Sequence, residues 1–460
     1  MNWVDLIVYI NFLILCYFIA SSLFYTLLLF GCIPGIYKHF TYSEYAKTDV
    51  LLNSNVLPPV TVSIAFYNEE ENIIHAVESA LNSTYPNLYI FLINDVSTDR
   101  SMELLKEYYD LMEVPVIIEY KIKTTPVKKT YVSRKHPNLM VFDKERNGGT
   151  GDSSNIAVNA CFTPYFITLD ADSILKENAI SEFMFDAITQ DHITAVGGGV
   201  YILNGCQFQE EKLKSSVLSN KFVPLIQSVE YIRSHLFART GWNVLGGAMG
   251  YSGTATFYDR NAVIKVGGFD NQNFAQDIEI IIHMHSYMHK NHIPYKVSFN
   301  PAAIVWTDVP RTFKEFAKQR DKWTRGILRY ALKHWNLFFN PLYKIQGLLG
   351  YPAYILLEVL APWIEFTAYI SLPISYVLGI FTPYTTFLYI ILAWGFISYI
   401  TVANMVINLV TFNCYKKLND IVLIFVLTAF ETFGFRQYRV LISVYGTIHY
   451  FINRLRGRPL

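Results

Sequence analysis

Long apolar runs lie near both ends of the chain, and short apolar runs separated by polar turns fill the middle. Leu6 to Tyr37 contains no Asp, Glu, Lys or Arg, and residues 345–415 contain only Glu358 and Glu365. Because about 20 apolar residues cross a bilayer, we predict spans over 6–30 and 385–411, and a third apolar helix from 421. Residues 38–344 carry 63 charges in 307 positions, a density typical of a soluble domain.

This pattern divides the chain into five predicted parts. They are an N-terminal transmembrane helix (1–37), a linker (38–57), a soluble α/β domain (58–335), C-terminal interface and transmembrane helices (336–435) and a basic amphipathic tail (436–460). Aromatic residues at both ends of the first span and a trailing Lys38 favour an N-terminus outside and a soluble domain in the cytosol. The tail interleaves arginines with tyrosines, which predicts a helix on the inner leaflet.

Two acidic residues interrupt the C-terminal apolar region. Glu358 and Glu365 lie seven positions apart and therefore share one helix face. Acidic groups at membrane depth often face a polar cavity with a function. The alternative is an interfacial helix whose carboxylates reach the headgroups, and the pattern leaves both open.

The soluble region repeats a strand, a polar turn and a helix. Strand-like runs over 60–66, 88–93 and 165–169 each end in polar residues, and apolar positions at helical spacing follow. This order predicts an α/β domain with a mainly parallel sheet. Ligands bind beyond the carboxyl ends of such strands, where Asp95, Asp170 and Asp172 fall.

Asp170 and Asp172 are candidate ligands of a divalent cation. Two carboxylates at one strand end, without Cys or His, favour Mg²⁺ or Mn²⁺, although this pair alone is also typical of caps and salt bridges. The near-neutral charge balance, 38 Lys and Arg against 37 Asp and Glu, gives no reason to expect a nucleic-acid partner. Five scattered cysteines show no pairing pattern.

Five motifs occur in the order of a known family. They are Asn94-Asp95-Val96-Ser97-Thr98-Asp99, Leu169-Asp170-Ala171-Asp172-Ser173, Tyr251-Ser252-Gly253-Thr254, Gln276-Asp277 and Gln319-Arg320-Asp321-Lys322-Trp323. Together they resemble the processive family-2 glycosyltransferases, the synthases of cellulose, chitin, hyaluronan and poly-N-acetylglucosamine. The resemblance implies a GT-A-like, Rossmann-like mixed sheet between transmembrane helices. It also implies an inverting transferase of the inner membrane that takes a UDP-sugar on the cytosolic side and extends a polysaccharide.

The resemblance also implies roles for single residues. Asp277 would be the catalytic base, and Asp170 and Asp172 would hold the uridine diphosphate and its Mg²⁺ or Mn²⁺. The other implied contacts are with the nucleotide or donor sugar (Ala65, Tyr67, Asn68, Asp95, Gln319, Lys322, Trp323) and with the acceptor (Gly253, Thr254, Trp323). One base and one metal site suit a single inverting displacement, because the base takes the acceptor proton.

Several positions depart from the family pattern. Gln276 stands where an acidic residue is usual, Lys322 where Arg is usual, and Thr150 where Lys is common. Lysine lacks the bidentate fork of arginine for phosphate, and we expect Arg320 or Arg325 to compensate. These departures leave two rivals open: a non-processive transferase with a lipid-linked acceptor, and a membrane scaffold with a decayed transferase fold. The sequence identifies neither the sugar nor any export subunit.

Two further groups of residues have a simple interpretation. His283 and His285 do not share a helix face, so we expect surface positions rather than a metal site. Residues 121–140 form a basic stretch, which predicts a solvated insertion or, alternatively, a contact with anionic lipid.

Overall fold

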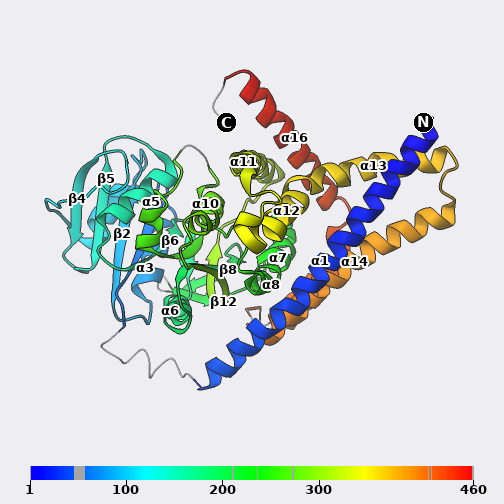
Figure 1. Cartoon of the computed structure of the whole chain (residues 1–460). Helices are drawn as coiled ribbons and strands as arrows, with labels where there is room; N and C mark the ends of the chain where they lie inside the picture. Colours follow the sequence, from blue (N-terminus) through cyan, green and yellow to red (C-terminus); the bar gives the residue numbers. More distant parts are fainter. Residues whose placement is uncertain are drawn as a thin grey trace.

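The computed structural model describes residues 2–45, 57–209, 212–235, 237–271, 274–412, 414–415 and 417–457. An α/β domain lies on one side, and long apolar helices form an arm on the other (Figure 1). The chain starts in the arm with α1 (Trp3–Tyr45), so the first part of the predicted linker is helical. Residues 46–56 of that linker lie outside the described residues.

One ten-stranded sheet forms the α/β domain, in the order β3-β4-β5-β2-β1-β6-β11-β8-β12-β7. Parallel pairs join β5, β2, β1 and β6, and another joins β8 to β12, whereas β11 runs antiparallel to both its neighbours. The sheet is therefore mixed. Its strands are β1 (Val60–Phe66), β2 (Leu88–Asn94), β3 (Leu111–Glu113), β4 (Val127–Ser133), β5 (Leu139–Lys144), β6 (Tyr165–Asp170), β7 (Ser173–Leu175), β8 (Ile193–Ile202), β11 (Ala255–Asp259) and β12 (Lys296–Thr307).

The central strands of this sheet are nearly continuous apolar runs, and their side chains are buried on both faces. Helices therefore cover both faces of the sheet. Each face packs a separate apolar cluster against its helices. The domain's helices are α3 (Ile73–Leu81), α4 (Ser101–Tyr109), α5 (Gly149–Ala160), α6 (Ala179–Thr189), α7 (Phe222–His235), α8 (Phe237–Trp242), α9 (Arg260–Lys265), α10 (Gln276–Lys290) and α11 (Phe313–Lys333). A small separate hairpin pairs β9 (Gln207–Gln209) with β10 (Lys212–Ser215).

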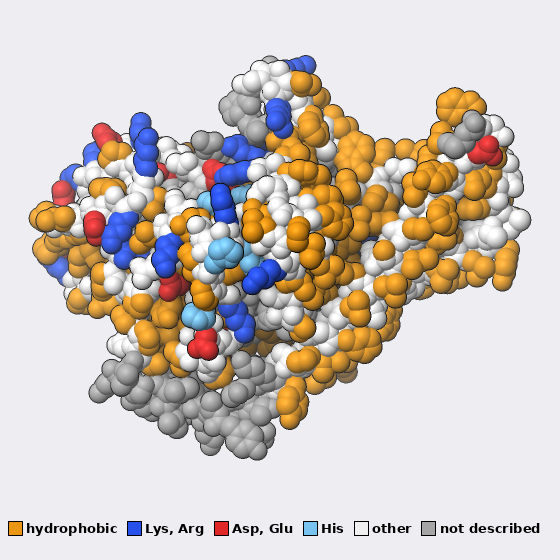
Figure 2. Space-filling model, viewed as in Figure 1, with side chains coloured by type: hydrophobic (Ala, Val, Ile, Leu, Met, Phe, Trp, Pro, Cys, Tyr) orange, Lys and Arg blue, Asp and Glu red, His pale blue; other side chains and the backbone are white. Residues whose placement is uncertain are grey.

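The arm contains the helices that are long and apolar enough to cross a membrane. Two described helices meet that condition, α1 over residues 3–37 and α14 (Pro383–Thr411), and they run side by side (Figure 1). A third candidate is the pair of helical segments 346–359 and 361–377, bent by 45° at its break. Figure 2 shows hydrophobic side chains covering the arm, with charged side chains gathered over the α/β domain. The remaining helices are α12 (Tyr351–Tyr354), α13 (Ala361–Val377), α15 (Leu418–Glu431) and α16 (Phe435–Leu455).

The basic tail is a helix, but its first arginines face protein carboxylates. Arg436 donates to Glu365 at 2.6 and 2.9 Å, and Arg439 donates to Glu230 at 2.9 Å. The expectation that all the tail arginines lie along the inner leaflet is therefore wrong for these two. Glu365 is buried within the protein, which contradicts the headgroup interpretation for this residue.

Candidate active site

Three strand ends meet at one edge of the sheet, as the sequence predicts. In the parallel register Ala65 of β1 pairs with Asp170 of β6, and Phe66 pairs with Asn94 of β2. Asp95 directly follows Asn94. The polar residues after these strands therefore occupy one edge, where a ligand of an α/β sheet binds.

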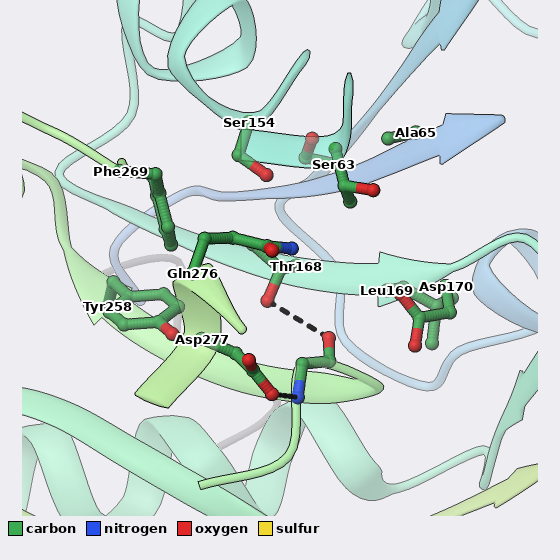
Figure 3. A pocket seen from close by; sticks show the side chains of 12 residues that line it. Ser63, Ala65, Ser154, Thr168, Leu169, Asp170, Tyr258, Phe269, Gln276 and Asp277 are labelled. Atoms are coloured by element: carbon green, nitrogen blue, oxygen red, sulfur yellow. Dashed lines mark hydrogen bonds between the residues drawn. The ribbon is translucent and has the colours of Figure 1, made fainter. Parts of the chain in front are cut away.

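Asp277 joins this edge from the first turn of α10. Its Oδ2 accepts a hydrogen bond from the backbone N–H of Gly253 at 2.7 Å (Figure 3). Gly253 and Thr254 precede β11, which pairs antiparallel with β6, and the N–H of Asp170 donates to the carbonyl of Thr254 at 3.4 Å. The loop before β11 thus places the Asp277 carboxylate next to the end of β6.

Burial raises the pKa of Asp277, Asp170 and Asp172 above the usual range of aspartate. For Asp170 the charge of Asp277 adds to burial, and for Asp172 the charge of Asp170 does so. Backbone N–H groups at the start of α10 and at Gly253 oppose the shift at Asp277 without cancelling it. The edge therefore concentrates negative charge that a cation would stabilise.

Two cavities border these aspartates. Asp170 and Asp277 line a small one of about 20 Å³, room for a single water (Figure 3). Its other lining residues are Ser63, Ala65, Thr150, Ser154, Thr168, Leu169, Gly253, Tyr258, Phe269 and Gln276. Asp172 lines a larger one of about 280 Å³, together with Asp308 and Arg311. Asp170 and Asp172 thus line different cavities.

Hydroxyl groups hold the carboxylate of Asp172. Its Oδ1 accepts hydrogen bonds from Ser173 Oγ at 3.0 Å and Thr307 Oγ1 at 3.3 Å. The ligand atoms that Asp170 and Asp172 offer are oxygens, which suit Mg²⁺ or Mn²⁺. No group of three or more His, Cys, Asp or Glu side chains that could hold a metal ion is found in the described part of the chain. A cation here would need further oxygens from its ligand.

Asp95 is buried and its carboxylate is already engaged. Its Oδ1 accepts from Lys144 Nζ at 2.5 Å and from the N–H of Gly148 at 2.9 Å, and its Oδ2 accepts from the N–H of Gly149 at 2.9 Å. Asp95 therefore fixes the glycine-rich turn before α5. A nucleotide contact through this side chain remains a prediction.

The turn after β1 is ordered by Asn68. Its backbone has a φ of 58°, and its Oδ1 accepts hydrogen bonds from the N–H groups of Thr98 and Asp99 at 2.7 and 3.3 Å. Asn68 thus shapes the loop that carries the first aspartate motif. Tyr67 beside it is half exposed at the same edge.

Helix α11 carries Gln319, Lys322 and Trp323 on one face, since they are three and four positions apart. Gln319 Oε1 is buried without a hydrogen-bond partner among the described residues. Burial and the charges of Lys318 and Arg325 lower the pKa of Lys322, whereas the charge of Asp170 opposes the shift. The Nζ of this lysine lies 4.0 Å from the centre of the Phe274 ring.

Both neighbouring arginines of α11 are paired with carboxylates. Arg320 is buried and donates to Glu230 at 3.0 Å, and Arg325 donates to Asp321 at 3.1 Å. The buried pair with Glu230 argues against Arg320 in this role, whereas compensation by Arg325 remains a prediction.

Comparison with known proteins decides the family. A family model described as "Glycosyl transferase family group 2" matches residues 165–399, over half of the chain, and "Glycosyl transferase family 2" matches 61–267. The chain belongs to glycosyl transferase family group 2. A poly-β-1,6-N-acetyl-D-glucosamine synthase of Staphylococcus aureus (strain COL) is 26% identical to this family-2 glycosyltransferase over 347 residues, covering 74% of this chain and 71% of the relative.

Solved structures are more distant from this glycosyltransferase. A mannosyltransferase from Pyrobaculum calidifontis with GDP-Man and Mn²⁺ aligns at a TM-score of 0.47 and 14% identity, covering 88% of this chain and 99% of that one. S. aureus TarS 1–349 with UDP-GlcNAc aligns at 0.42 and 12% identity, covering 87% and 92%. Both superpositions are too loose to carry a conclusion about this chain.

Sequence patterns missed some buried polar residues of the transferase domain. His285 is fully buried, with Tyr295 Oη at 2.8 Å from its Nδ1 and the Ala248 carbonyl at 3.1 Å from its Nε2, so the expected surface position is wrong. Glu230 lies buried on α7 and pairs with arginines from two other helices. The periodicity of the sequence does not predict the contacts of His285 or Glu230, because these contacts join distant parts of the chain.

The basic stretch is not an insertion, because it contains strand β4 of the sheet, and three of its six Lys and Arg side chains (Lys121, Lys129 and Arg134) form ion pairs. Lys129 lies 2.7 Å from Glu113, Lys121 lies 3.2 Å from Glu119, and the side chains of all four residues are well exposed. Such surface pairs contribute little to stability. A contact of the other basic residues with anionic lipid remains a prediction.

Gly253→Ala is expected to lower transferase turnover about tenfold with little change in thermal stability. A Cβ at this position would lie 3.2 Å from Asp277 Cβ and 3.3 Å from its Oδ2, so the carboxylate must shift. Steady-state kinetics of UDP release would measure the loss. Gly395→Ala is the matched control, because its new Cβ would meet no atom within 4 Å. Equal turnover in both variants would contradict this placement of Asp277.

The raised pKa of Asp277 predicts an acid limb in the pH profile of the transferase. A base must be ionised, so activity is present above its pKa and is lost as pH falls through it. Because the shift is upward, the loss should begin above the ordinary aspartate value of about 3.9. The measurement is kcat/KM between about pH 4 and 9. An acid limb at or below the ordinary value would contradict the prediction.

Proposed function

We propose that this protein is a membrane-integrated, inverting glycosyltransferase that transfers a sugar from a UDP-sugar to a growing polysaccharide. The observation that carries the proposal is the hydrogen bond between Asp277 and Gly253, which holds one carboxylate at the strand edge that ends in Asp170. That arrangement provides one base beside one acidic, oxygen-rich edge. A single inverting displacement needs these parts, whereas a glycosidase needs two carboxylates that flank the bond.

In this proposal Asp277 takes the proton from the acceptor hydroxyl. The N–H of Gly253 orients its Oδ2, and its raised pKa makes it a better proton acceptor than an ordinary aspartate. Gly253 and Thr254 form the loop against which the acceptor sugar lies. The apolar face of Trp323 stacks on the C–H side of that sugar.

Asp170 and Asp172 hold the donor diphosphate through Mg²⁺ or Mn²⁺. Bound there, the cation supplies positive charge for the departing UDP. Lys322 adds a second positive charge on the facing helix, and Gln319 closes the donor site. The turn of Ala65, Tyr67 and Asn68, with the loop that Asp95 fixes, surrounds the nucleotide.

The proposed placement puts the α/β domain in the cytosol, between transmembrane helices of a multi-pass inner-membrane protein. The apolar surfaces of α1 and α14 support contact with lipid. On α16, Leu441, Tyr445, Ile448, Ile452 and Leu455 are exposed at spacings of three and four, which forms an apolar stripe. This stripe would lie on the cytosolic leaflet.

The named relative favours an N-acetylhexosamine donor and a polysaccharide product, since it is a poly-β-1,6-N-acetyl-D-glucosamine synthase. The test is UDP release by the purified full-length protein with UDP-glucose, UDP-N-acetylglucosamine or UDP-glucuronate, in Mg²⁺ or Mn²⁺, followed by product sizing. We expect long products from UDP-N-acetylglucosamine. Single-sugar lipid products would support the lipid-linked alternative, and no UDP release from any donor would support the scaffold alternative.

A further inference from the structure

Glu230 lies at a junction of three helices. Its side chain is 6% exposed on α7; Oε2 accepts from Arg320 of α11 at 3.0 Å, and Oε1 accepts from Arg439 of α16 at 2.9 Å. Burial raises the pKa of Glu230, but the two guanidinium groups outweigh burial and lower it. The carboxylate is therefore ionised, with a separate arginine on each oxygen.

Arg320 connects this carboxylate to Trp323. Its guanidinium lies 4.3 Å from the centre of the Trp323 ring and 4.7 Å from that of Phe316. A planar guanidinium stacks well on aromatic faces, and a carboxylate that fixes its position also fixes the ring beneath it. Glu230 thereby restricts the orientation of Trp323 without touching it.

Helix α16 is fastened to α11 along its length. Tyr438 Oη donates to the carbonyl of Phe313 at 3.0 Å, and His449 Nδ1 lies 3.0 Å from Asp321 Oδ1. A Cβ built on Gly446 would lie 3.0 Å from Thr324, so the two backbones approach closely. In Figure 1 this final helix lies beside α11. The link from Arg439 to Glu230 is thus part of an extended contact between α16 and the α/β domain.

We propose that Glu230 is a positioning residue that holds Trp323, through Arg320, in the orientation that receives the acceptor sugar. This inference rests on the proposed function, because Trp323 is the acceptor platform there. Replacing buried Arg–Glu–Arg groups by apolar residues often leaves a protein no less stable. We therefore attribute the contacts of Glu230 with Arg320 and Arg439 to the orientation of Trp323 rather than to the stability of the fold.

The test is Glu230→Gln in the full-length protein, with two readouts: UDP released, and sugar incorporated into product per UDP released. When the acceptor is misplaced, water accepts the sugar in its place and the UDP-sugar is hydrolysed. Incorporation per UDP released should therefore fall about tenfold, and products should become shorter. The KM for the UDP-sugar should stay within about twofold, because the proposed function places Trp323 against the acceptor and other residues against the donor.

Glu431→Gln is the matched control. Glu431 of α15 is also buried, accepts from Arg233 of α7 at 2.7 and 3.2 Å, and belongs to the same charge cluster as Glu230. Its loss therefore disturbs a comparable pair in that cluster that involves neither Arg320 nor Trp323. It should lower thermal stability without changing incorporation per UDP. An equal fall in both variants would overturn the proposal in favour of general destabilisation.

Arg320→Lys keeps the positive charge but removes the planar guanidinium that stacks on Trp323. This variant tests the positioning role if Glu230→Gln does not fold. We expect the same fall in incorporation and the same unchanged donor KM. Wild-type incorporation per UDP in either folded variant would overturn the positioning role. Absence of UDP release from the wild-type protein would instead contradict the proposed function.

Discussion

Asp277→Asn is expected to lower turnover by about 10²–10⁴-fold, the usual contribution of a general base. Asparagine has the same shape and still offers an oxygen to the N–H of Gly253, which lies 2.7 Å from the present carboxylate. It cannot accept the acceptor proton. Binding of the UDP-sugar should stay within about threefold, because the change removes a transition-state interaction. The measurement is UDP release at saturating donor, with donor affinity from calorimetry.

Glu279→Gln is the control for this change, since it removes a carboxylate two positions further along α10. Glu279 is buried and pairs with Lys333 at 2.7 Å and His334 at 3.0 Å. Its loss should lower thermal stability, because the Glu279 carboxylate is buried, while turnover per folded molecule is retained. Full turnover in Asp277→Asn would show that another group takes the proton.

Asp172→Asn is expected to remove most of the divalent-cation dependence of UDP binding and to lower turnover by about 10²-fold or more. Loss of a cation that stabilises the leaving diphosphate costs several kcal/mol, and each 1.36 kcal/mol is tenfold in rate. Asparagine can still accept from Ser173 and Thr307, so local structure should persist. Calorimetric titration of UDP in Mn²⁺ and in chelator would show the change.

Asp308→Asn is the matched control, because Asp308 lines the same larger cavity as Asp172. Its carboxylate is engaged by Arg311 at 3.3 Å and by the side-chain amide of Asn204. We expect cation-dependent UDP binding within about threefold of wild type. If Asp172→Asn kept wild-type binding in Mn²⁺ while Asp308→Asn lost it, the metal assignment would move to Asp308.

The strand ends were predictable because they depend on local pattern and on one topological rule. Apolar runs of strand length followed by Asn94–Asp95 and by Asp170 to Asp172 place these residues at one edge of a parallel sheet, and the register confirms it. The position of Asp277 beside Gly253 was not available from pattern, because it depends on how the loop before β11 meets α10. The family resemblance, not periodicity, singled out both residues.

Contacts between residues that lie far apart in the sequence could not be predicted from the sequence pattern. Arg320 and Glu230 are 90 positions apart, and Arg439 and Glu230 are 209 apart. No periodicity of 2 or 3.6 residues reports such pairs. The pattern of arginines after residue 435 therefore predicted a helix that faces lipid, although Arg439 pairs with the buried Glu230.

Asp95, at the candidate site, is another residue whose contacts the sequence motif did not predict. Its motif marked it as a nucleotide contact, and its carboxylate is bound to Lys144 and to the backbone of Gly148 and Gly149. A motif records that a residue type is needed in a region. It does not separate a residue that touches the ligand from one that shapes the loop around it.

The most direct test of the account is an experimental structure of the full-length protein with UDP and Mn²⁺. We expect Mn²⁺, located by its anomalous signal, to be coordinated directly by Asp172 and by the diphosphate, with Asp170 beside it and the Asp277 carboxylate facing the same cleft. A diphosphate bound at another edge of the sheet, or Mn²⁺ held without either Asp170 or Asp172, would contradict it.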